Sequence, residues 1–196
     1  MGVAFSDFVG ARKGQVTEVN SQLSGQSLYA LDADADAYLV ALADGRVYMV
    51  ETEHLARQSL TTVDVTRSVC ELNFSQTPAC LVTEDAQLVR DTIYRGRTIQ
   101  AADTLGAAQY MLDQAVAYSL DRKQFNRAIG SFQAVKHMCA EMASQLEPCR
   151  SFVWYAGHAF DEMDNEAALT ACHAKAHLAE VGQFVAKTST EVHGGM

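Results

Sequence analysis

The feature that most constrains the fold is a change in hydrophobic period near residue 83. Before it, apolar residues alternate with polar ones or form short runs bounded by turn residues, which is typical of β-strands. After it, apolar residues recur every three or four positions, which is typical of amphipathic helices. Strands followed by helices indicate an α+β architecture. We therefore predict a β-domain, part of an antiparallel β-barrel, over residues 1–82 and an α-helical bundle over residues 83–196.

The β half contains several short runs of β-forming residues separated by turn signals. Strands are predicted over 16–23, 27–31, 38–43 and 47–51. The turn signals are Ser24-Gly25, the segment 32–36 and Asp44-Gly45. An Asp-Gly pair between two apolar runs strongly favours a β-hairpin.

The alternation is cleanest from Ser68 to Phe74. Cys70, Leu72 and Phe74 fall on one side of the predicted strand and are expected to be buried. Pro78 is expected to end the strand region, because proline cannot donate to a sheet ladder.

Three long helices are predicted in the second half. The first runs from its expected N-cap, Thr83, to about Leu120. The second starts near Ser131 and keeps its apolar spacing across Pro148, so we expect one kinked helix there rather than two. The third follows a turn at 161–165, and short connections between long helices indicate an up-down bundle. The stripes expected to be buried in the first and third helices are Leu105, Ala108, Leu112, Ala115 and Ser119, and Ala171, Ala174, Leu178, Val181 and Val185.

Composition excludes several classes of function. The net charge of -9 disfavours nucleic acid as a partner, because phosphate binding needs clustered Lys and Arg. The chain has no run of about 18 apolar residues, so no membrane span is expected. Its five cysteines form no Cys-x-x-Cys motif, and their odd number favours reduced thiols in a cytoplasmic protein.

No metal site is expected. His173 and His177 are four residues apart on one helix, but the intervening Ala-Lys-Ala lacks the Glu of a His-Glu-x-x-His zinc motif. The alternating acids of segment 32–36 lack the Gly and terminal Glu of an EF-hand loop.

The connection between the first two predicted helices carries far more specified chemistry than a turn requires. Segment 121–138 contains Arg122, Gln124, Phe125 and Ile129, followed by Phe132-Gln133. This pattern resembles the Arg-x-x-Phe-Gly-x-x-Ile…Phe-Gln signature of acyl-CoA dehydrogenases, flavoenzymes that desaturate acyl-CoA thioesters. Segment 191–195, Glu-Val-His-Gly-Gly, resembles the Gln-x-x-Gly-Gly element of the same family.

The resemblance implies a cofactor, FAD, which in this family lies across a subunit interface. It implies that acyl-CoA is the substrate, that an electron-transferring flavoprotein accepts the electrons, and that the chain forms a homo- or hetero-oligomer. Arg97 matches the family's arginine near the CoA thioester. The residues implied to contact FAD are Arg122, Gln124, Phe125, Gln133, Glu191, Val192, His193, Gly194 and Gly195. The physical logic agrees, since Arg presents a fixed fork to phosphate and paired glycines let backbone approach a diphosphate.

Three positions depart from the family pattern. Asn126 replaces the usual Gly, although Asn tolerates left-handed backbone. Glu191 replaces the usual Gln, and an acid beside a pyrophosphate is unfavourable unless it faces elsewhere. Tyr94 stands where Asp is common.

The chain contains no residue that the resemblance nominates as catalytic base. That Glu lies beyond the Gly-Gly element in most members, and in other branches it corresponds to Gly96. Members also begin with a further α-helical domain, so we expect a fragment or one piece of a split enzyme. Three hypotheses follow: an FAD-dependent acyl-CoA dehydrogenase of fatty acid or steroid degradation, a non-catalytic partner subunit of one, or a flavin-dependent oxidase or monooxygenase on the same fold.

Overall fold

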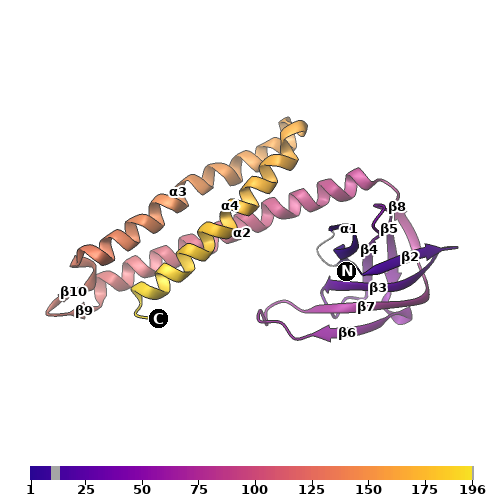
Figure 1. The fold of residues 1–196 in the computed structure, drawn as a ribbon, viewed down its shortest axis with the longest axis horizontal. Coiled ribbons are helices and arrows are strands. Elements are labelled where there is room, and N and C mark those ends of the chain that lie inside the picture. Colours follow the sequence, from indigo (N-terminus) through magenta and orange to yellow (C-terminus); the bar gives the residue numbers. More distant parts are fainter. Residues whose placement is uncertain (10–13, 196) are drawn as a thin grey trace. The chain divides into compact units, whose positions relative to one another are not determined.

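The computed structural model describes residues 1–9 and 14–195, and the chain divides into two compact units, Met1–Arg90 and Asp91–Met196. Figure 1 shows a sheet-based N-terminal unit and a helical C-terminal unit. This α+β architecture confirms the fold class predicted from the change of period.

The first unit is built on an eight-stranded sheet with the strand order β6-β7-β3-β1-β4-β5-β8, in which β2 also pairs with β3. A short helix, α1 (Ser6–Val9), and a 3-10 turn, η1 (Thr52–His54), complete the unit. The strands are β1 (Gly2–Ala4), β2 (Gln15–Val19), β3 (Gln22–Leu31), β4 (Ala37–Ala41), β5 (Val47–Glu51), β6 (Ala56–Leu60), β7 (Val69–Pro78) and β8 (Cys80–Thr83).

The expectation of a purely antiparallel sheet is wrong in one respect. Strand β1 pairs parallel with β4, with Val3 opposite Leu39, so the sheet is mixed. Among the described residues the ladder runs from β6 to β8 without closing on itself. The parallel pair joins segments far apart in sequence, so no local turn signal announces it.

The first hairpin turns four residues earlier than predicted. Asn20 and Ser21 both have positive φ and connect β2 to β3, as in the primed turns that suit hairpin twist. The predicted turn at Ser24-Gly25 lies inside β3, where Gly25 has φ +114° beside a register shift. Glycine commonly marks such a β-bulge within a strand. The Asp44-Gly45 hairpin between β4 and β5 is confirmed.

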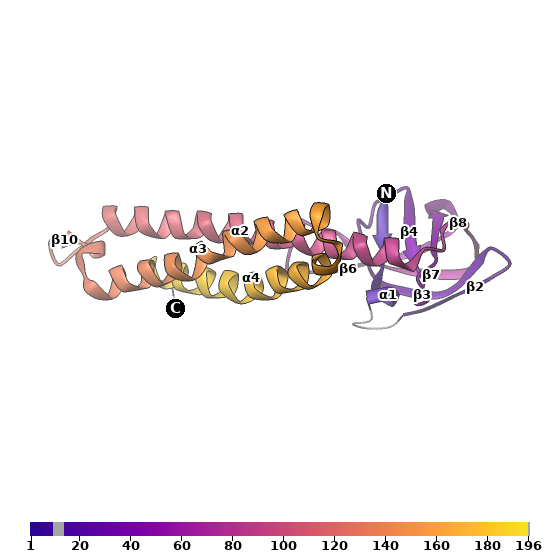
Figure 2. The same ribbon diagram turned by 90° about the horizontal axis from the view of Figure 1, so that it is seen from above.

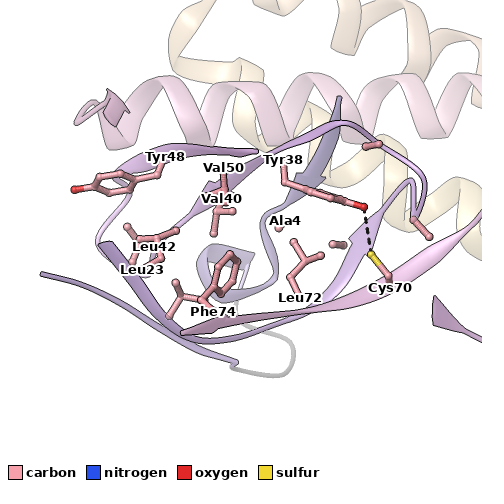
Figure 3. Close-up of a cluster of buried hydrophobic side chains, with 14 residues drawn as sticks. Ala4, Leu23, Tyr38, Val40, Leu42, Tyr48, Val50, Cys70, Leu72 and Phe74 are labelled. Atoms are coloured by element: carbon pink, nitrogen blue, oxygen red, sulfur yellow. Dashed lines mark hydrogen bonds between the residues drawn. The ribbon is translucent and has the colours of Figure 1, made fainter. Parts of the chain in front are cut away.

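The core of the first unit lies where the clean alternation predicted it. Cys70, Leu72 and Phe74 of β7 are buried, as Figure 3 shows. Strand β8 follows Pro78, however, so the proline does not end the strand region. Tyr38 is fully buried in this core and donates a hydrogen bond to the Asp32 carbonyl at 2.6 Å. Burial disfavours the phenolate and raises the pKa of Tyr38 to about 12.

The second unit is a three-helix bundle formed by α2 (Ala86–Asp121), α3 (Gln133–Glu162) and α4 (Asp164–Val192). Figure 2 shows the three helices side by side along much of their length. Both predicted stripes are buried between them, from Leu105 to Ser119 in α2 and from Ala171 to Val185 in α4. The N-cap of α2 is Asp85 rather than Thr83, because the Asp85 carboxylate accepts the Gln87 backbone N–H at 2.8 Å.

Pro148 lies inside α3, which continues through it as predicted. The proline is on the exposed side of the helix, while Met142, Leu146 and Cys149 pack into the core. Packing of this stripe holds the helix together where proline removes a backbone donor. All five cysteines are free, and burial raises the pKa of the Cys149 thiol.

Candidate functional site

The connection between α2 and α3 is a small β-hairpin rather than an open turn. Strands β9 (Lys123–Gln124) and β10 (Arg127–Ala128) pair antiparallel, and a 3-10 turn, η2 (Ile129–Ser131), leads into α3. The Ile129 N–H also donates to the Arg122 carbonyl at 2.8 Å, which extends the ladder by one pair. Sequence reasoning identified this segment as special but did not predict a hairpin.

The hairpin turns over two residues with left-handed backbone, Phe125 at φ +52° and Asn126 at φ +61°. Asn126 therefore adopts the conformation that suits the Gly it replaces. A bulky aromatic residue rarely tolerates positive φ, and Phe125 is also 86% exposed. Backbone strain of this kind clusters at binding sites, and a solvated phenyl ring at a strained turn is typical of a residue kept for contact with a ligand or partner.

The register of the hairpin decides which side chains share a face. Gln124 lies directly opposite Arg127, and Lys123 opposite Ala128. Successive side chains of a strand alternate between faces. Arg122, Gln124 and Arg127 therefore lie on one face of the hairpin, and Lys123 lies on the other. All four of these polar side chains are exposed.

Aromatic contacts brace the hairpin against the start of α3. The Phe125 and Phe132 rings meet edge to face with centroids 6.1 Å apart. The guanidinium carbon of Arg127 lies 4.0 Å from the centroid of Phe132. Gln133, the last predicted cofactor residue of this segment, is exposed at the first position of α3.

The predicted Gly-Gly element ends α4. Gly194 has φ +87°, its N–H bonds to the Glu191 carbonyl at 3.0 Å, and the Gly195 N–H bonds to the Thr190 carbonyl at 2.9 Å. These are the two hydrogen bonds of a Schellman cap. A Cβ on Gly195 would meet the Thr190 methyl at 2.6 Å. Helix termination thus accounts for both glycines before any ligand is considered.

The side chains at this end of α4 differ in what they offer. Glu191 and His193 are exposed, whereas Val192 is only 5% exposed and packs in the bundle core. Only the backbone of Val192 is thus left to face a ligand. The His193 Nδ1 lies 2.7 Å from the Ser189 carbonyl, so Nδ1 carries the hydrogen.

The two predicted segments lie at the same end of the bundle. The His193 ring stacks on Tyr118 with centroids 4.6 Å apart, and Arg122 follows one helical turn after Tyr118, donating its N–H to the Tyr118 carbonyl. Ser189 is buried and donates to the Met111 carbonyl at 3.1 Å. These contacts bring together residues 75 and 78 positions apart in the sequence.

Arg97 lies at a separate place on α2. The 25 positions between Arg97 and Arg122 correspond to roughly 37 Å at 1.5 Å per residue. The Arg97 guanidinium lies 3.1 Å from the Cys172 Sγ and over the Tyr94 ring. Gly96 precedes it, and a Cβ added there would have no atom within 4 Å. The position has room for a side chain that this chain does not supply.

Two further observations concern membrane-spanning helices and metal-binding clusters. Within residues 1–9 and 14–195, no helix has the length and apolar character needed to cross a bilayer. In the same part of the chain, no three His, Cys, Asp or Glu side chains are grouped so as to hold a metal ion.

Comparison with known proteins identifies the family. The model of the acyl-CoA dehydrogenase C-terminal domain matches residues 86–196. The chain belongs to the acyl-CoA dehydrogenase family. It is 31% identical to the acyl-CoA dehydrogenase IpdE2 of Mycolicibacterium smegmatis over 86% of this chain and 50% of that protein. It is 29% identical to the acyl-CoA dehydrogenase FadE34 of Mycobacterium tuberculosis over 93% of this chain and 26% of that protein.

A solved structure is similar over nearly the whole chain. The ChsE4-ChsE5 complex of Mycobacterium tuberculosis contains a chain that is 26% identical, with a TM-score of 0.78 over 98% of this chain and 55% of that one. The chain thus spans between a quarter and about half the length of the relatives it matches. Members of the family typically bind FAD.

Sequence reasoning missed one exposed residue of the hairpin, Arg127. Arg127 occupies an unspecified position of the family signature, yet it shares a face with Arg122 and Gln124. No clear signal for this face is present in the sequence, because Phe125-Asn126 lacks the glycine that usually marks a two-residue hairpin turn.

Proposed function

We propose that this chain is part of an FAD-dependent acyl-CoA dehydrogenase and that its hairpin binds the diphosphate and adenine end of FAD across a subunit interface. The observation that carries the proposal is the shared face of Arg122 and Gln124 beside the exposed, strained Phe125. An arginine fork suits phosphate oxygens, and an exposed phenyl ring suits a flat base.

The charges of the hairpin fit an anionic ligand. Among the described residues, Arg122 and Arg127 make no ion pair within 4 Å, although the whole chain carries a net charge of -9. Uncompensated cations on an acidic protein concentrate attraction for an anion at one place. Glu191 is exposed at the neighbouring helix end and opposes this attraction, so the hairpin rather than the Gly-Gly element supports the assignment.

The residues of this chain bind and position in the proposed reaction. When bound, FAD accepts as hydride the hydrogen that leaves Cβ of the acyl-CoA thioester. The proton at Cα has to be taken by a base close to it, and we assign no base to this chain because Gly96 has no side chain. Arg97, half-buried on α2, is proposed to face the thioester end of the substrate. Arg122, Gln124 and Phe125 hold the far end of the cofactor.

A specific observation favours a second function, that of a non-catalytic partner subunit. Gly96 has no side chain that could act as the catalytic base at this position of α2. The similar chain of ChsE4-ChsE5 occurs in a complex. In this function the hairpin completes the cofactor site of a competent partner, in the cytoplasm, with an electron-transferring flavoprotein as acceptor. The cofactor-binding face is the same in both functions.

Absorbance of the purified protein tests the proposal. The full-length gene product, isolated with any dehydrogenase subunit encoded beside it, is expected to show a flavin band that bleaches anaerobically with acyl-CoA. If the flavin bleaches only when the partner subunit is present, and not with this chain alone, the result identifies the non-catalytic function. Absence of any flavin would refute the cofactor assignment.

Substitution of Arg122 tests the hairpin itself. Arg122→Ala is expected to weaken FAD binding about tenfold, because a charge-assisted hydrogen bond at an exposed site contributes at the lower end of 1.5–3 kcal/mol. The matched control is Arg90→Ala, which removes an exposed cation near the opposite end of α2. Equal flavin retention by both variants after gel filtration contradicts the assignment.

A further inference from the structure

We propose that Arg127 is a second phosphate-binding residue of this site, which with Arg122 recognises the diphosphate of an ADP-containing cofactor, and that Phe132 positions it. The inference rests on the proposed function of the hairpin. It adds a residue at a position that the family signature leaves unspecified.

The register places two guanidinium groups on one face. Arg127 is the direct partner of Gln124 across the hairpin, and opposite side chains of an antiparallel pair have Cβ atoms about 5 Å apart. Arg122 precedes Gln124 by two residues, roughly 7 Å along the strand, and also points to this face. Arg122, Gln124 and Arg127 therefore surround one patch of surface. In such a patch, the guanidinium groups of Arg122 and Arg127 can each contact one phosphate of the same diphosphate.

Phe132 restricts where the Arg127 side chain lies. Its ring centroid is 4.0 Å from the guanidinium carbon, which is within the range of a stacked cation–π contact. A stacked arginine keeps its N–H edges free to donate, since only its flat face is covered. Phe132 also makes an edge-to-face contact with Phe125. The contact reduces the entropy that Arg127 loses when it binds an anion.

Arg127 has no competing acidic partner among the residues that the structure describes. Lys123 has the same charge and is equally exposed, but it pairs with Ala128 on the opposite face. The hairpin thus contains its own control. Loss of either cation changes the net charge equally, and only one of the two faces the proposed ligand.

The chemistry of the patch identifies the class of ligand. Two forks bind a diphosphate, and the exposed Phe125 ring suits stacking of an adenine. FAD and coenzyme A both contain adenosine with a diphosphate, whereas FMN contains neither. We assign the patch to FAD, because the hairpin carries the family's FAD signature. Comparing the affinities for FAD, FMN and coenzyme A distinguishes a cofactor site from a substrate site.

The test measures the affinity of the purified full-length protein, with its partner subunit if one co-purifies, after removal of flavin. FAD, FMN and coenzyme A are titrated into the native protein and into Arg127→Ala, Lys123→Ala and Arg122→Ala. We expect Arg127→Ala to weaken FAD binding about tenfold at low salt and less at high salt, since screening weakens an exposed contact. Lys123→Ala is expected to change it less than twofold, and FMN binding is expected to stay the same in all variants.

The outcomes separate this inference from the proposed function. If Arg122→Ala weakens FAD binding and Arg127→Ala does not, the inference fails and the proposed function stands. If Lys123→Ala and Arg127→Ala weaken it equally, general attraction explains the effect and the shared face is refuted. If none of the three changes FAD affinity, both fail. If Arg127→Ala weakens coenzyme A binding instead, the patch belongs to the substrate and the assignment to FAD is overturned.

A second variant tests the positioning by Phe132. Phe132→Leu removes the stacking surface and is expected to weaken FAD binding severalfold, whereas Phe132→Tyr keeps the ring and is expected to bind as the native protein does. In an Arg127→Ala background, Phe132→Leu is expected to have a smaller effect, because the group that it positions is gone. Equal effects in both backgrounds would show that Phe132 acts on the fold alone.

Discussion

A close contact between α2 and α4 predicts that one added methyl group changes the free energy of unfolding. Gly182 lies in α4, and a Cβ added to it would be 2.6 Å from the Cγ2 of Thr104 in α2. Thr104 cannot easily turn away, because its Oγ1 donates to the Gln100 carbonyl at 2.9 Å and β-branched side chains have few rotamers in a helix. We therefore expect Gly182→Ala to force the two helices apart.

Two opposing terms set the magnitude. Replacing a helical glycine by alanine gains about 1 kcal/mol in helix propensity. Overpacking a closely fitted contact costs about 1–3 kcal/mol. The net expectation is that Gly182→Ala lowers the free energy of unfolding by about 1 kcal/mol. Gly157 in α3 is the matched control, because a Cβ there meets no atom within 4 Å. Gly157→Ala should then raise the free energy of unfolding by about 1 kcal/mol.

Urea unfolding followed by far-UV circular dichroism measures both variants, with the change in midpoint interpreted at constant slope. Thr104→Ser removes the Cγ2 and keeps the hydroxyl that bonds to Gln100. In that background Gly182→Ala is expected to become stabilising, which is a double-mutant test of the contact. If Gly182→Ala stabilises the native chain as much as Gly157→Ala does, the close approach of α4 to α2 is wrong.

Two more predictions concern the turn of the hairpin and the core of the sheet. Asn126→Val is expected to speed hydrogen exchange at the Ile129 amide about tenfold, because a β-branched residue at positive φ costs roughly 1–2 kcal/mol. Asn126→Gly should leave that exchange unchanged or slower, and similar rates in both variants would argue against left-handed backbone there. Burial raises the pKa of Tyr38 from 10.0 to about 12, so above pH 10 the phenol ionises more readily in the unfolded chain than in the folded one. The contribution of the neutral phenol to the free energy of unfolding is therefore fully present below pH 10 and is lost as pH rises toward about 12. Tyr38→Phe should lack this loss in urea unfolding against pH, and parallel curves for the two proteins would contradict it.

Local sequence patterns predicted the elements whose side chains fill a core. The alternating residues that end at Phe74 are buried as expected, and so are the stripes through Leu112 in α2 and Leu178 in α4. A buried face needs apolar residues at the spacing of its strand or helix, and this spacing can be read from the sequence. Strands β1, β6 and β8 were missed. Strand β1 is held by pairing with distant segments, and β6 and β8 lie at the edges of the sheet with mostly exposed residues. Such strands have no apolar period of their own to detect.

The candidate site shows the same division between local and non-local information. The signature around Arg122 and Phe125 was readable, because the residue types themselves carry the chemistry. The hairpin was not, since Phe125-Asn126 is an unusual pair for a two-residue turn that normally contains glycine. Without the hairpin, the side on which Arg127 lies is undetermined. Register, rather than residue type, decides that Arg127 and Lys123 face opposite ways.

Pro148 in the middle of α3 also affects the order of folding. Without its N–H, the helix loses a hydrogen bond at its centre, and each half is about 15 residues long. Isolated helices of that length are marginal in water. The two halves of α3 therefore become one helix only when Met142, Leu146 and Cys149 have docked against α2 and α4. Continuity of this helix therefore depends on its packing in the bundle, and we expect α3 to form together with its neighbours rather than ahead of them.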